Sequence, residues 1–272
     1  MSVIEIHKQL AEEHGGMDTE PNAPVSVDGK TAVVIGGTRG IGRAIALGFA
    51  ADGADVVATS RSRDAVADVA AELRERGAAT AELTCDVTDT ESIEALRDAA
   101  IETFGGVDVL VNSAGAVATS AVTELSDEEW QRDIDVCLTG VFRACRAFGR
   151  AMSEGSIINI SSMSADQARE ERAAYCAAKS GVNGLTRAVA ADLAPDIRVN
   201  AIAPGFVKTE MAGPKLDDGT AFRETVDERT PMERVATPDE IAGTAVYLAS
   251  DAASFTTGEI ITVDGGYDDS AQ

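Results

Sequence analysis

The chain has few of the residues that bind metals or form disulfides. Among its 272 residues are only two histidines, His7 and His14, both close to the start. The four cysteines stand far apart without any CxxC pair, at Cys85, Cys137, Cys145 and Cys176. Zinc sites and disulfide frameworks need clustered or paired ligands. We therefore expect reduced thiols and no bound metal.

Basic residues and long apolar runs are also scarce. The chain has 23 Lys and Arg against 46 Asp and Glu, which gives a net charge of −23. No stripe of Lys or Arg offsets this charge, so nucleic acids and anionic membranes are excluded as expected partners. No apolar run reaches the roughly 18 to 20 residues of a membrane span, and the start lacks the regions of a signal peptide. We expect a cytoplasmic protein.

The acidic residues are scattered along the chain rather than gathered into a tail, a pattern typical of halophilic proteins. Dispersed carboxylates repel one another over a Debye length of about 10 Å at 0.1 M salt but only about 3 Å at 1 M. We therefore expect the protein to lose structure at low salt. The alternative is an acidic surface that serves solubility alone.

From about residue 30, short β-branched runs alternate with longer Ala-rich segments of helical period. This alternation is typical of βαβ units and predicts an α/β fold with one parallel sheet flanked by helices. Seven strands are predicted, at residues 31–35, 55–59, 80–84, 109–112, 156–160, 198–203 and 259–263. Six helices are predicted, at residues 40–52, 64–76, 90–104, 127–152, 173–194 and 238–249.

No linker or repeat divides the main part of the sequence, so residues 25–272 are predicted to form one domain. Residues 1–24 are predicted to be a flexible arm, because Gly15-Gly16 is followed by Asp, Glu, Pro and Asn. An arm that packs on a neighbouring subunit is the alternative. Residues 205–235 are rich in Gly, Pro and charge, and they predict neither a clear strand nor a clear helix.

A glycine-rich turn follows the first predicted strand and leads directly into an apolar helix. Glycines let the backbone turn sharply and approach a pyrophosphate, which the N–H groups of the helix N-terminus then bind. With a second strand starting at residue 55, this context indicates dinucleotide binding. The turn residues expected to contact the dinucleotide are Gly36, Thr38, Arg39, Gly40, Ile41 and Gly42.

The end of the second predicted strand favours NADP over NAD. An acidic residue there would bind an unphosphorylated ribose, but the chain has Ser60 and Arg61. Arg61 and Arg39 can converge on a 2′-phosphate through charge-assisted hydrogen bonds. A solvated arginine at a strand end is the alternative for Arg61.

Three further residues form a catalytic pattern. Ser162 follows the fifth predicted strand, and Tyr175 precedes Lys179 by four residues in the next helix. This spacing puts the phenol and the ammonium on one helical face, where the cation favours the phenolate and so suits the tyrosine to acid–base work. The serine hydroxyl can orient a reacting carbonyl oxygen.

On these residues together the sequence resembles the short-chain dehydrogenase/reductase family over roughly residues 28–267. Further matching segments are Cys-Asp-Val at 85–87, Asn-Ser-Ala-Gly at 112–115, Ile-Arg-Val-Asn-Ala at 197–201, Pro-Gly-Phe at 204–206 and Val-Asp-Gly-Gly at 263–266. The resemblance implies a Rossmann-type, doubly wound sheet of order 3-2-1-4-5-6-7, a homotetramer and a mobile substrate lid at 205–235.

The resemblance also implies roles for individual residues. Tyr175 would pass the proton, Ser162 would stabilise the carbonyl oxygen, and Lys179 would hold the ribose hydroxyls. Around an NADP(H) coenzyme, Asp86 and Val87 would lie at the adenine, Asn112, Ala114 and Gly115 would support the sheet and line the coenzyme, and Pro204, Gly205, Val207 and Thr209 would close over the nicotinamide.

Two positions depart from the family pattern: Ile35, where the glycine motif usually begins with Thr, and Cys137, which bears on catalysis. Cys137 stands where the family has a catalytic Asn that helps to hold a proton-relay water, partly through its backbone carbonyl. Cysteine keeps that carbonyl, so we expect a slower relay at Cys137. A weakly catalytic NADP-binding module is the alternative.

Among family members the chain is most similar to 3-oxoacyl-thioester reductases, which implies reduction of a substrate such as acetoacetyl-CoA. A CoA thioester is favoured over an acyl carrier protein because residues 152–155 lack a basic patch. The alternative is an NADP-dependent sugar or polyol dehydrogenase. Arg169 and Arg172 could bind an anionic carrier, although a solvated loop paired with Glu170 and Glu171 is slightly preferred.

Overall fold

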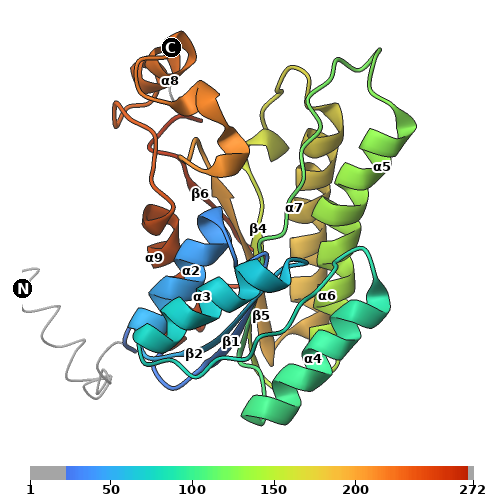
Figure 1. Ribbon diagram of the computed structural model, residues 1–272, viewed down its shortest axis with the longest axis vertical. Helices are drawn as coiled ribbons and strands as arrows, with labels where there is room; N and C mark the ends of the chain where they lie inside the picture. The colour runs from blue at the N-terminus through green and yellow to red at the C-terminus, as the bar shows by residue number, and fades with distance from the viewer. Residues whose placement is uncertain (1–22, 269–272) are drawn as a thin grey trace, which may run out of the picture.

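The computed structural model describes residues 23–268 of the chain. The predicted N-terminal arm therefore lies outside the described residues, apart from its last two positions. Figure 1 shows a central sheet with helices on both sides.

Six parallel strands form the sheet, in the order β2-β1-β3-β4-β5-β6. Most of their side chains are buried on both faces, as expected for a sheet covered by two helical layers. The strand order reverses direction between β1 and β3, which is the arrangement of a doubly wound sheet. The predicted fold class is confirmed. The strands are β1 (Thr31–Ile35), β2 (Asp55–Thr59), β3 (Val109–Asn112), β4 (Gly155–Ile160), β5 (Ile197–Pro204) and β6 (Ile260–Val263).

The strand predicted at residues 80–84 is absent, so the sheet has six strands rather than seven. The segment still runs beside β2, because Val56 N–H donates to the Ala79 carbonyl (3.0 Å) and Cys85 N–H donates to the Ser60 carbonyl (3.0 Å). Between these two ends no backbone ladder forms, and Glu82 is exposed. The Leu83 carbonyl accepts a hydrogen bond from the Thr59 hydroxyl (2.5 Å), so single contacts rather than a backbone ladder hold this segment beside β2.

Two helical layers enclose the sheet (Figure 1). One layer holds α2 (Gly40–Ala51), α3 (Arg63–Glu75) and α9 (Asp239–Ala249). The other holds α4 (Thr90–Phe104), α5 (Asp127–Ile134), α6 (Gly140–Gly149) and α7 (Ala173–Leu193). Each layer shares a separate apolar core with its face of the sheet. None of the described helices is both long and apolar enough to cross a membrane.

The single helix predicted over residues 127–152 is interrupted. A π-helical turn at Asp135–Thr139 separates α5 from α6. Such turns insert one extra residue into a helix and are frequent at functional sites. Sequence periodicity does not reveal this insertion, because the apolar pattern continues through it.

The segment 205–235 is more regular than its composition predicts. It contains α8 (Ala221–Arg229) and two short 3₁₀ turns, Glu210–Ala212 and Pro214–Leu216. Thr220 caps α8 by accepting a hydrogen bond from Arg223 N–H. Leu216, Val226 and Val235 form a small apolar cluster that is separate from the two cores. The prediction that this segment lacks a helix is therefore wrong.

Candidate active site

A cleft of about 890 Å³ lies at the carboxyl ends of the strands. The residues that follow β1, β2, β3, β4 and β5 all reach it, as is usual for ligand sites of open parallel sheets. The predicted site residues that line it are Gly36, Thr38, Arg39, Gly40, Ile41, Ser60, Arg61, Asp86, Val87, Ala114, Gly115, Ser162, Tyr175, Lys179, Pro204, Gly205, Val207 and Thr209. Gly42, Asn112 and Cys137 lie behind this surface.

Gly36 and Gly42 of the glycine turn are packed so closely that neither position has room for a Cβ atom. A Cβ atom at Gly36, whose φ is +79°, would lie 2.5 Å from the Ala114 nitrogen. A Cβ atom at Gly42 would lie 2.2 Å from the Gly36 carbonyl oxygen. Gly42 therefore acts from behind the cleft by letting α2 approach the turn.

The N-terminus of α2 is open to a ligand. No side chain caps this end, and the first turn of α2 contains no acidic residue. Its N–H groups and the positive end of the helix dipole together suit a phosphate. This cradle fits the pyrophosphate of a nicotinamide dinucleotide.

The turn after β2 fits the adenosine end of such a coenzyme. Ser60 Oγ is buried and has no hydrogen-bond partner among the described residues. Arg61 and Arg39 line the cleft with it. Burial alone would raise the pKa of the Asp86 carboxyl, but hydrogen bonds from Thr88 and the charge of Arg61 outweigh it and lower that pKa.

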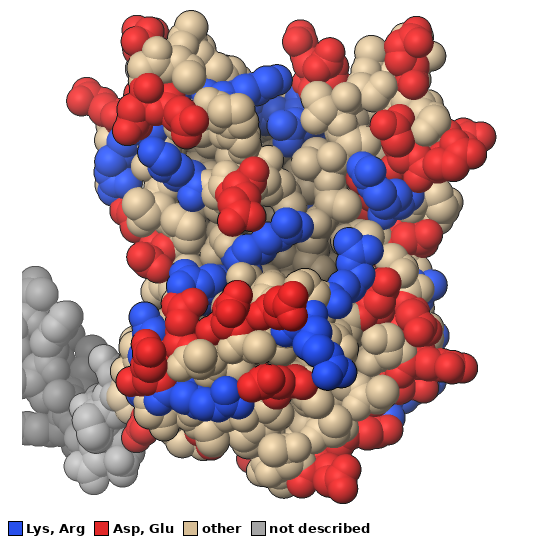
Figure 2. Space-filling view, viewed as in Figure 1, with Lys and Arg blue, Asp and Glu red and all other residues tan. Residues whose placement is uncertain are grey.

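Positive charge gathers in the cleft of this otherwise acidic protein. Eight Lys or Arg residues line it against four Asp or Glu residues, whereas the whole chain has twice as many acids as bases. Figure 2 shows Lys and Arg side chains beside the hollow of this face, surrounded by many Asp and Glu side chains. A polyanionic ligand thus meets a locally favourable field.

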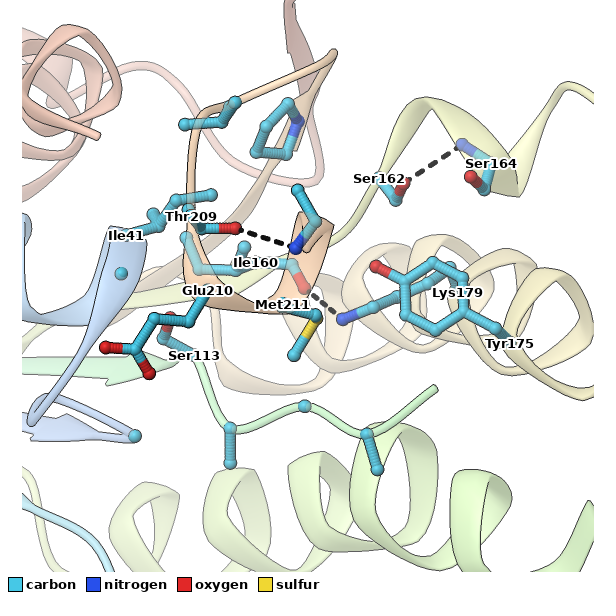
Figure 3. Close-up of a pocket in the computed structure, with 18 of the residues that line it drawn as sticks. Ile41, Ser113, Ile160, Ser162, Ser164, Tyr175, Lys179, Thr209, Glu210 and Met211 are labelled. Carbon is cyan, nitrogen blue, oxygen red and sulfur yellow. Dashed lines mark hydrogen bonds between the residues drawn. The ribbon is translucent and has the colours of Figure 1, made fainter. Parts of the chain in front are cut away.

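Ser162, Tyr175 and Lys179 lie together on one side of the cleft (Figure 3). Lys179 is 4% exposed, and its Nζ donates to the Ile160 carbonyl at 2.6 Å. The same Nζ lies 5.6 Å from the centre of the half-buried Tyr175 ring. Ser162 Oγ accepts a hydrogen bond from Ser164 N–H (3.1 Å), which leaves its own proton able to donate to a substrate oxygen.

A buried amide pair supports this constellation from behind. Asn112 Nδ2 donates to Asn159 Oδ1 (2.9 Å), and Asn159 Nδ2 donates to Thr186 Oγ1 (3.0 Å). These bonds link β3, β4 and α7. The segment 113–115 follows β3, Ser162 follows β4, and α7 carries Tyr175 and Lys179. Asn112 therefore supports the sheet, and the cleft-lining part of its predicted role falls to Ser113, Ala114 and Gly115.

Cys137 lies in the π-helical turn and is fully buried. Its Sγ donates to the Ala116 carbonyl (3.1 Å) and accepts from Ala116 N–H (3.3 Å). The thiol thus joins the turn to the segment after β3, whereas the neighbouring Val136 and Ala116 line the cleft. The side chain of Cys137 acts on the site through Ala116 rather than by facing a ligand.

The substrate side of the cleft brings together Phe206, Tyr267 and Arg169, a grouping that the sequence did not predict. Phe206 lines the cleft, and its ring packs edge-on against Tyr267 with centroids 5.2 Å apart. Arg169 also lines the cleft and contacts both rings. The preferred sequence interpretation of Arg169, a solvated residue paired with Glu170 or Glu171, is wrong. The signal available in the sequence was its position between Ser162 and Tyr175.

Comparison with known proteins identifies the family to which this chain belongs. A model of the family described as enoyl-(acyl carrier protein) reductase matches residues 35–268. The chain belongs to the short-chain dehydrogenase/reductase family. It is therefore an oxidoreductase that acts on a CH–OH/C=O pair, and the resemblance seen in the sequence is confirmed.

Relatives within the family act on different compounds. A 3β-hydroxysteroid dehydrogenase of Eggerthella lenta is 43% identical over 88% of this chain and 93% of its own. A galactitol 2-dehydrogenase of Cereibacter sphaeroides is 42% identical over 89% and 96%, and a 3-oxoacyl-[acyl-carrier-protein] reductase of Vibrio cholerae is 37% identical over 89% and 98%.

A solved structure gives the same fold with a coenzyme. The structure of a candidate gluconate 5-dehydrogenase of Beutenbergia cavernae, with NADP bound, has a TM-score of 0.84 and is 40% identical over 90% of this chain and 98% of its own.

Proposed function

We propose that this short-chain dehydrogenase/reductase uses NADP(H) as its coenzyme. The observation that carries the proposal is the end of β2, where Ser60 and Arg61 replace the acidic residue that would bind an unphosphorylated ribose. Arg39 lines the same part of the cleft, and the buried Ser60 Oγ lacks a partner among residues 23–268. A 2′-phosphate would supply the acceptor that all three donors require.

The coenzyme, when bound, supplies or accepts the hydride, and the side chains of this chain handle the proton. Tyr175 donates its phenolic proton to the carbonyl oxygen in reduction, and Ser162 donates a hydrogen bond to that oxygen. Lys179 lies beside the Tyr175 ring, where its positive charge would stabilise the negative charge that develops on the phenol oxygen as the proton leaves, and the Ile160 carbonyl fixes the position of Nζ. A general acid placed in this way typically contributes about 10²- to 10⁴-fold to the rate.

The coenzyme assignment is tested by Arg61→Ala. We expect kcat/KM for NADP(H) to fall about 10- to 100-fold, because one or two charge-assisted bonds are lost, with little change for NAD(H). Arg63→Ala is the matched control, since Arg63 is exposed on the next turn but does not line the cleft. An unchanged coenzyme preference in Arg61→Ala would refute the assignment.

For the substrate, the first candidate is a 3-oxoacyl thioester such as acetoacetyl-CoA. The Vibrio cholerae relative and the matched family description support it, as does the excess of basic residues along the cleft. The test is NADPH oxidation by the purified protein with acetoacetyl-CoA. Rapid turnover would support this candidate, and bound NADPH without turnover would remove it.

A second candidate is a sugar, sugar acid or polyol, with the protein acting as a dehydrogenase. The galactitol 2-dehydrogenase relative and the gluconate 5-dehydrogenase neighbour favour it. NADP reduction with a panel of sugars, polyols and aldonic acids tests it directly. Activity on this panel without activity on acetoacetyl-CoA would replace the first candidate by the second.

We further propose that the protein assembles as a homotetramer. The large apolar side chains left exposed include Trp130 on α5, Phe142 on α6 and Phe255, which is 104% exposed. Subunit contacts would remove such side chains from water. Native mass spectrometry should give four times the 28.1 kDa chain mass, and a monomer would contradict the proposal.

We also propose that the protein is adapted to high salt, because its large negative charge is spread along the whole chain. With a net charge of −23, repulsion between carboxylates should weaken folding in dilute buffer. We expect the melting temperature to rise by several degrees or more between dilute buffer and molar KCl. A melting temperature that does not change would leave the acidic surface as a solubility device.

A further inference from the structure

One arginine of the cleft is held by aromatic rings and sulfur instead of by a carboxylate. The guanidinium carbon of Arg169 lies 4.7 Å from the ring centre of Phe206 and 5.4 Å from that of Tyr267. Its Nη2 lies 3.0 Å from Met163 Sδ. Within the part of the chain that the structure describes, Arg169 forms no ion pair. Its positive charge is therefore positioned without being neutralised.

These contacts place Arg169 beside the reacting groups. Met163 directly follows Ser162, and Phe206 directly follows Gly205, and all four residues line the cleft. A group bound to Arg169 would consequently belong to the same small molecule whose oxygen Ser162 and Tyr175 contact.

The chemistry of the side chain selects the kind of group. A guanidinium has five N–H donors in one plane, and aromatic faces attract its charge without accepting those hydrogens in the plane. The thioether of Met163 is a weak acceptor. Two parallel N–H donors match the two oxygens of a carboxylate, a common bidentate partner of this fork.

The loop that carries Arg169 is fixed, which lowers the entropic cost of binding. Ser120 N–H donates to the Glu171 carbonyl at 2.9 Å, and Ser120 and Arg172 form an isolated parallel bridge. Arg169 is half-buried, whereas Glu170 and Glu171 are exposed. The arginine is thus presented to the cleft at a set position.

We propose that Arg169 is a specificity-determining residue that binds a carboxylate of the substrate. The substrate class is then an oxo acid or hydroxy acid whose carboxylate lies a few bonds from the reacting carbon. This inference rests on the proposed NADP(H)-dependent activity and narrows its substrate. It disfavours acetoacetyl-CoA, because the pantetheine arm separates the phosphates of CoA from the thioester.

The test compares two ketones that differ in charge, acetoacetate and methyl acetoacetate, with NADPH at one fixed salt concentration. We expect the wild type to favour acetoacetate at least tenfold in kcat/KM. Arg169→Gln should lose about 10- to 100-fold with acetoacetate, the effect of removing a charged, two-point hydrogen bond, and less than about threefold with the ester. Arg169→Lys should recover part of the loss, because a point charge replaces the fork.

Arg146→Gln is the matched control. Arg146 also lies over an aromatic ring, at 5.0 Å from the centre of Phe142, but outside the cleft. Arg146→Gln should leave kcat/KM unchanged for both acetoacetate and methyl acetoacetate. NADPH affinity, followed by coenzyme fluorescence, should stay within about twofold in all variants, which separates a substrate effect from a folding defect.

The outcomes distinguish this inference from the proposed function. Equal losses on the two ketones in Arg169→Gln, or a wild type that prefers the ester or acetoacetyl-CoA, would overturn the role of Arg169 while NADPH-dependent reduction stands. No NADPH oxidation with any of the three compounds, and no NADP reduction with D-gluconate or D-glucitol, would contradict the proposed function and the inference together.

Discussion

Near the ends of β1 and β2 the cleft is lined by tight turns in which backbone packs against backbone, as Gly36 does against Ala114. On its other side it is lined by side chains from residues 163–172 and 205–235, which approach from distant parts of the chain. The first region, which we call the turn side, uses short local motifs. The second, the loop side, uses contacts such as Arg169 on Phe206. Local motifs can be recognised in a sequence, whereas contacts between distant loops cannot be predicted from it.

The largest expected effect lies between the two sides, at Tyr175. Tyr175→Phe removes the proposed proton donor but keeps the ring beside Lys179. We expect kcat to fall about 10³-fold or more, while the dissociation constant of NADPH changes less than about threefold. Stopped-flow turnover and coenzyme fluorescence measure the two quantities. Substantial residual activity would mean that another group passes the proton.

On the turn side, Gly42→Ala should strongly weaken coenzyme binding. The added Cβ would lie 2.2 Å from the Gly36 carbonyl oxygen, so the turn must shift. We expect the dissociation constant of NADPH to rise about tenfold or more, since each 1.4 kcal/mol of lost binding free energy is a factor of ten.

Gly184→Ala is the matched control for this variant. Gly184 lies within α7, and a Cβ atom there would meet nothing within 4 Å. It should stabilise the fold by about 0.4 to 1 kcal/mol, because alanine restricts the unfolded chain and favours the helix, with unchanged coenzyme binding. Equal effects of the two substitutions in calorimetry and fluorescence titration would show that the close packing of the turn is unimportant.

A smaller effect is expected at Cys137, where the turn side meets the π-helical turn. An asparagine amide can donate to and accept from the Ala116 backbone as the thiol does, with stronger hydrogen bonds. We expect Cys137→Asn to raise kcat about two- to tenfold by speeding the proton relay. Cys137→Ser, which lacks the amide, is the control. A wild type that turns over and an Asn variant that gains nothing would refute the relay argument.

The smallest effect is expected at the ion pair of Arg234 and Glu240, which lies on the surface and outside the cleft. Hydrogen bonding from Arg234, helped by Thr237 N–H, lowers the pKa of Glu240 to about 2, below its ordinary value of 4.5. The folded state therefore binds this proton less readily than the unfolded state. The pair stabilises the fold above about pH 4.5 and loses that contribution as the pH falls toward 2.

Glu240→Gln should remove this dependence. The difference in melting temperature between wild type and variant should be small, because the pair is largely exposed, and it should shrink between pH 6 and pH 3. Thermal unfolding followed by circular dichroism measures it. A difference that grows on acidification would contradict the sign of the pKa change.

Most elements could be predicted because each leaves a local signal, whereas the strand order was implied by the family resemblance alone. β1, β2 and β3 are short β-branched runs with the predicted bounds, and α4 begins and ends where its capping residues place it. The segment 80–84 also has a strand-like composition. It is held beside β2 by single contacts, such as that of the Thr59 hydroxyl with the Leu83 carbonyl, which composition does not reveal.

The candidate site divides in the same way. Gly36, Arg61, Ser162, Tyr175 and Lys179 could be placed in one cleft because each follows a strand or shares a helical turn. The contact of the Cys137 thiol with Ala116 could not be predicted, since the two residues are 21 positions apart in the sequence.

The same limit applies to Arg169, whose setting depends on Phe206 and Tyr267 from much later in the sequence. Substrate choice, which this region would govern, therefore depends on contacts between distant segments that the sequence does not reveal.

The most direct test of the account is the affinity of the wild-type protein for the two reduced coenzymes, measured by fluorescence titration at matched salt. The cluster of Arg39, Ser60 and Arg61 predicts that NADPH binds at least about tenfold more tightly than NADH, which corresponds to about 1.4 kcal/mol or more from the 2′-phosphate. Equal affinities, or tighter binding of NADH, would contradict it.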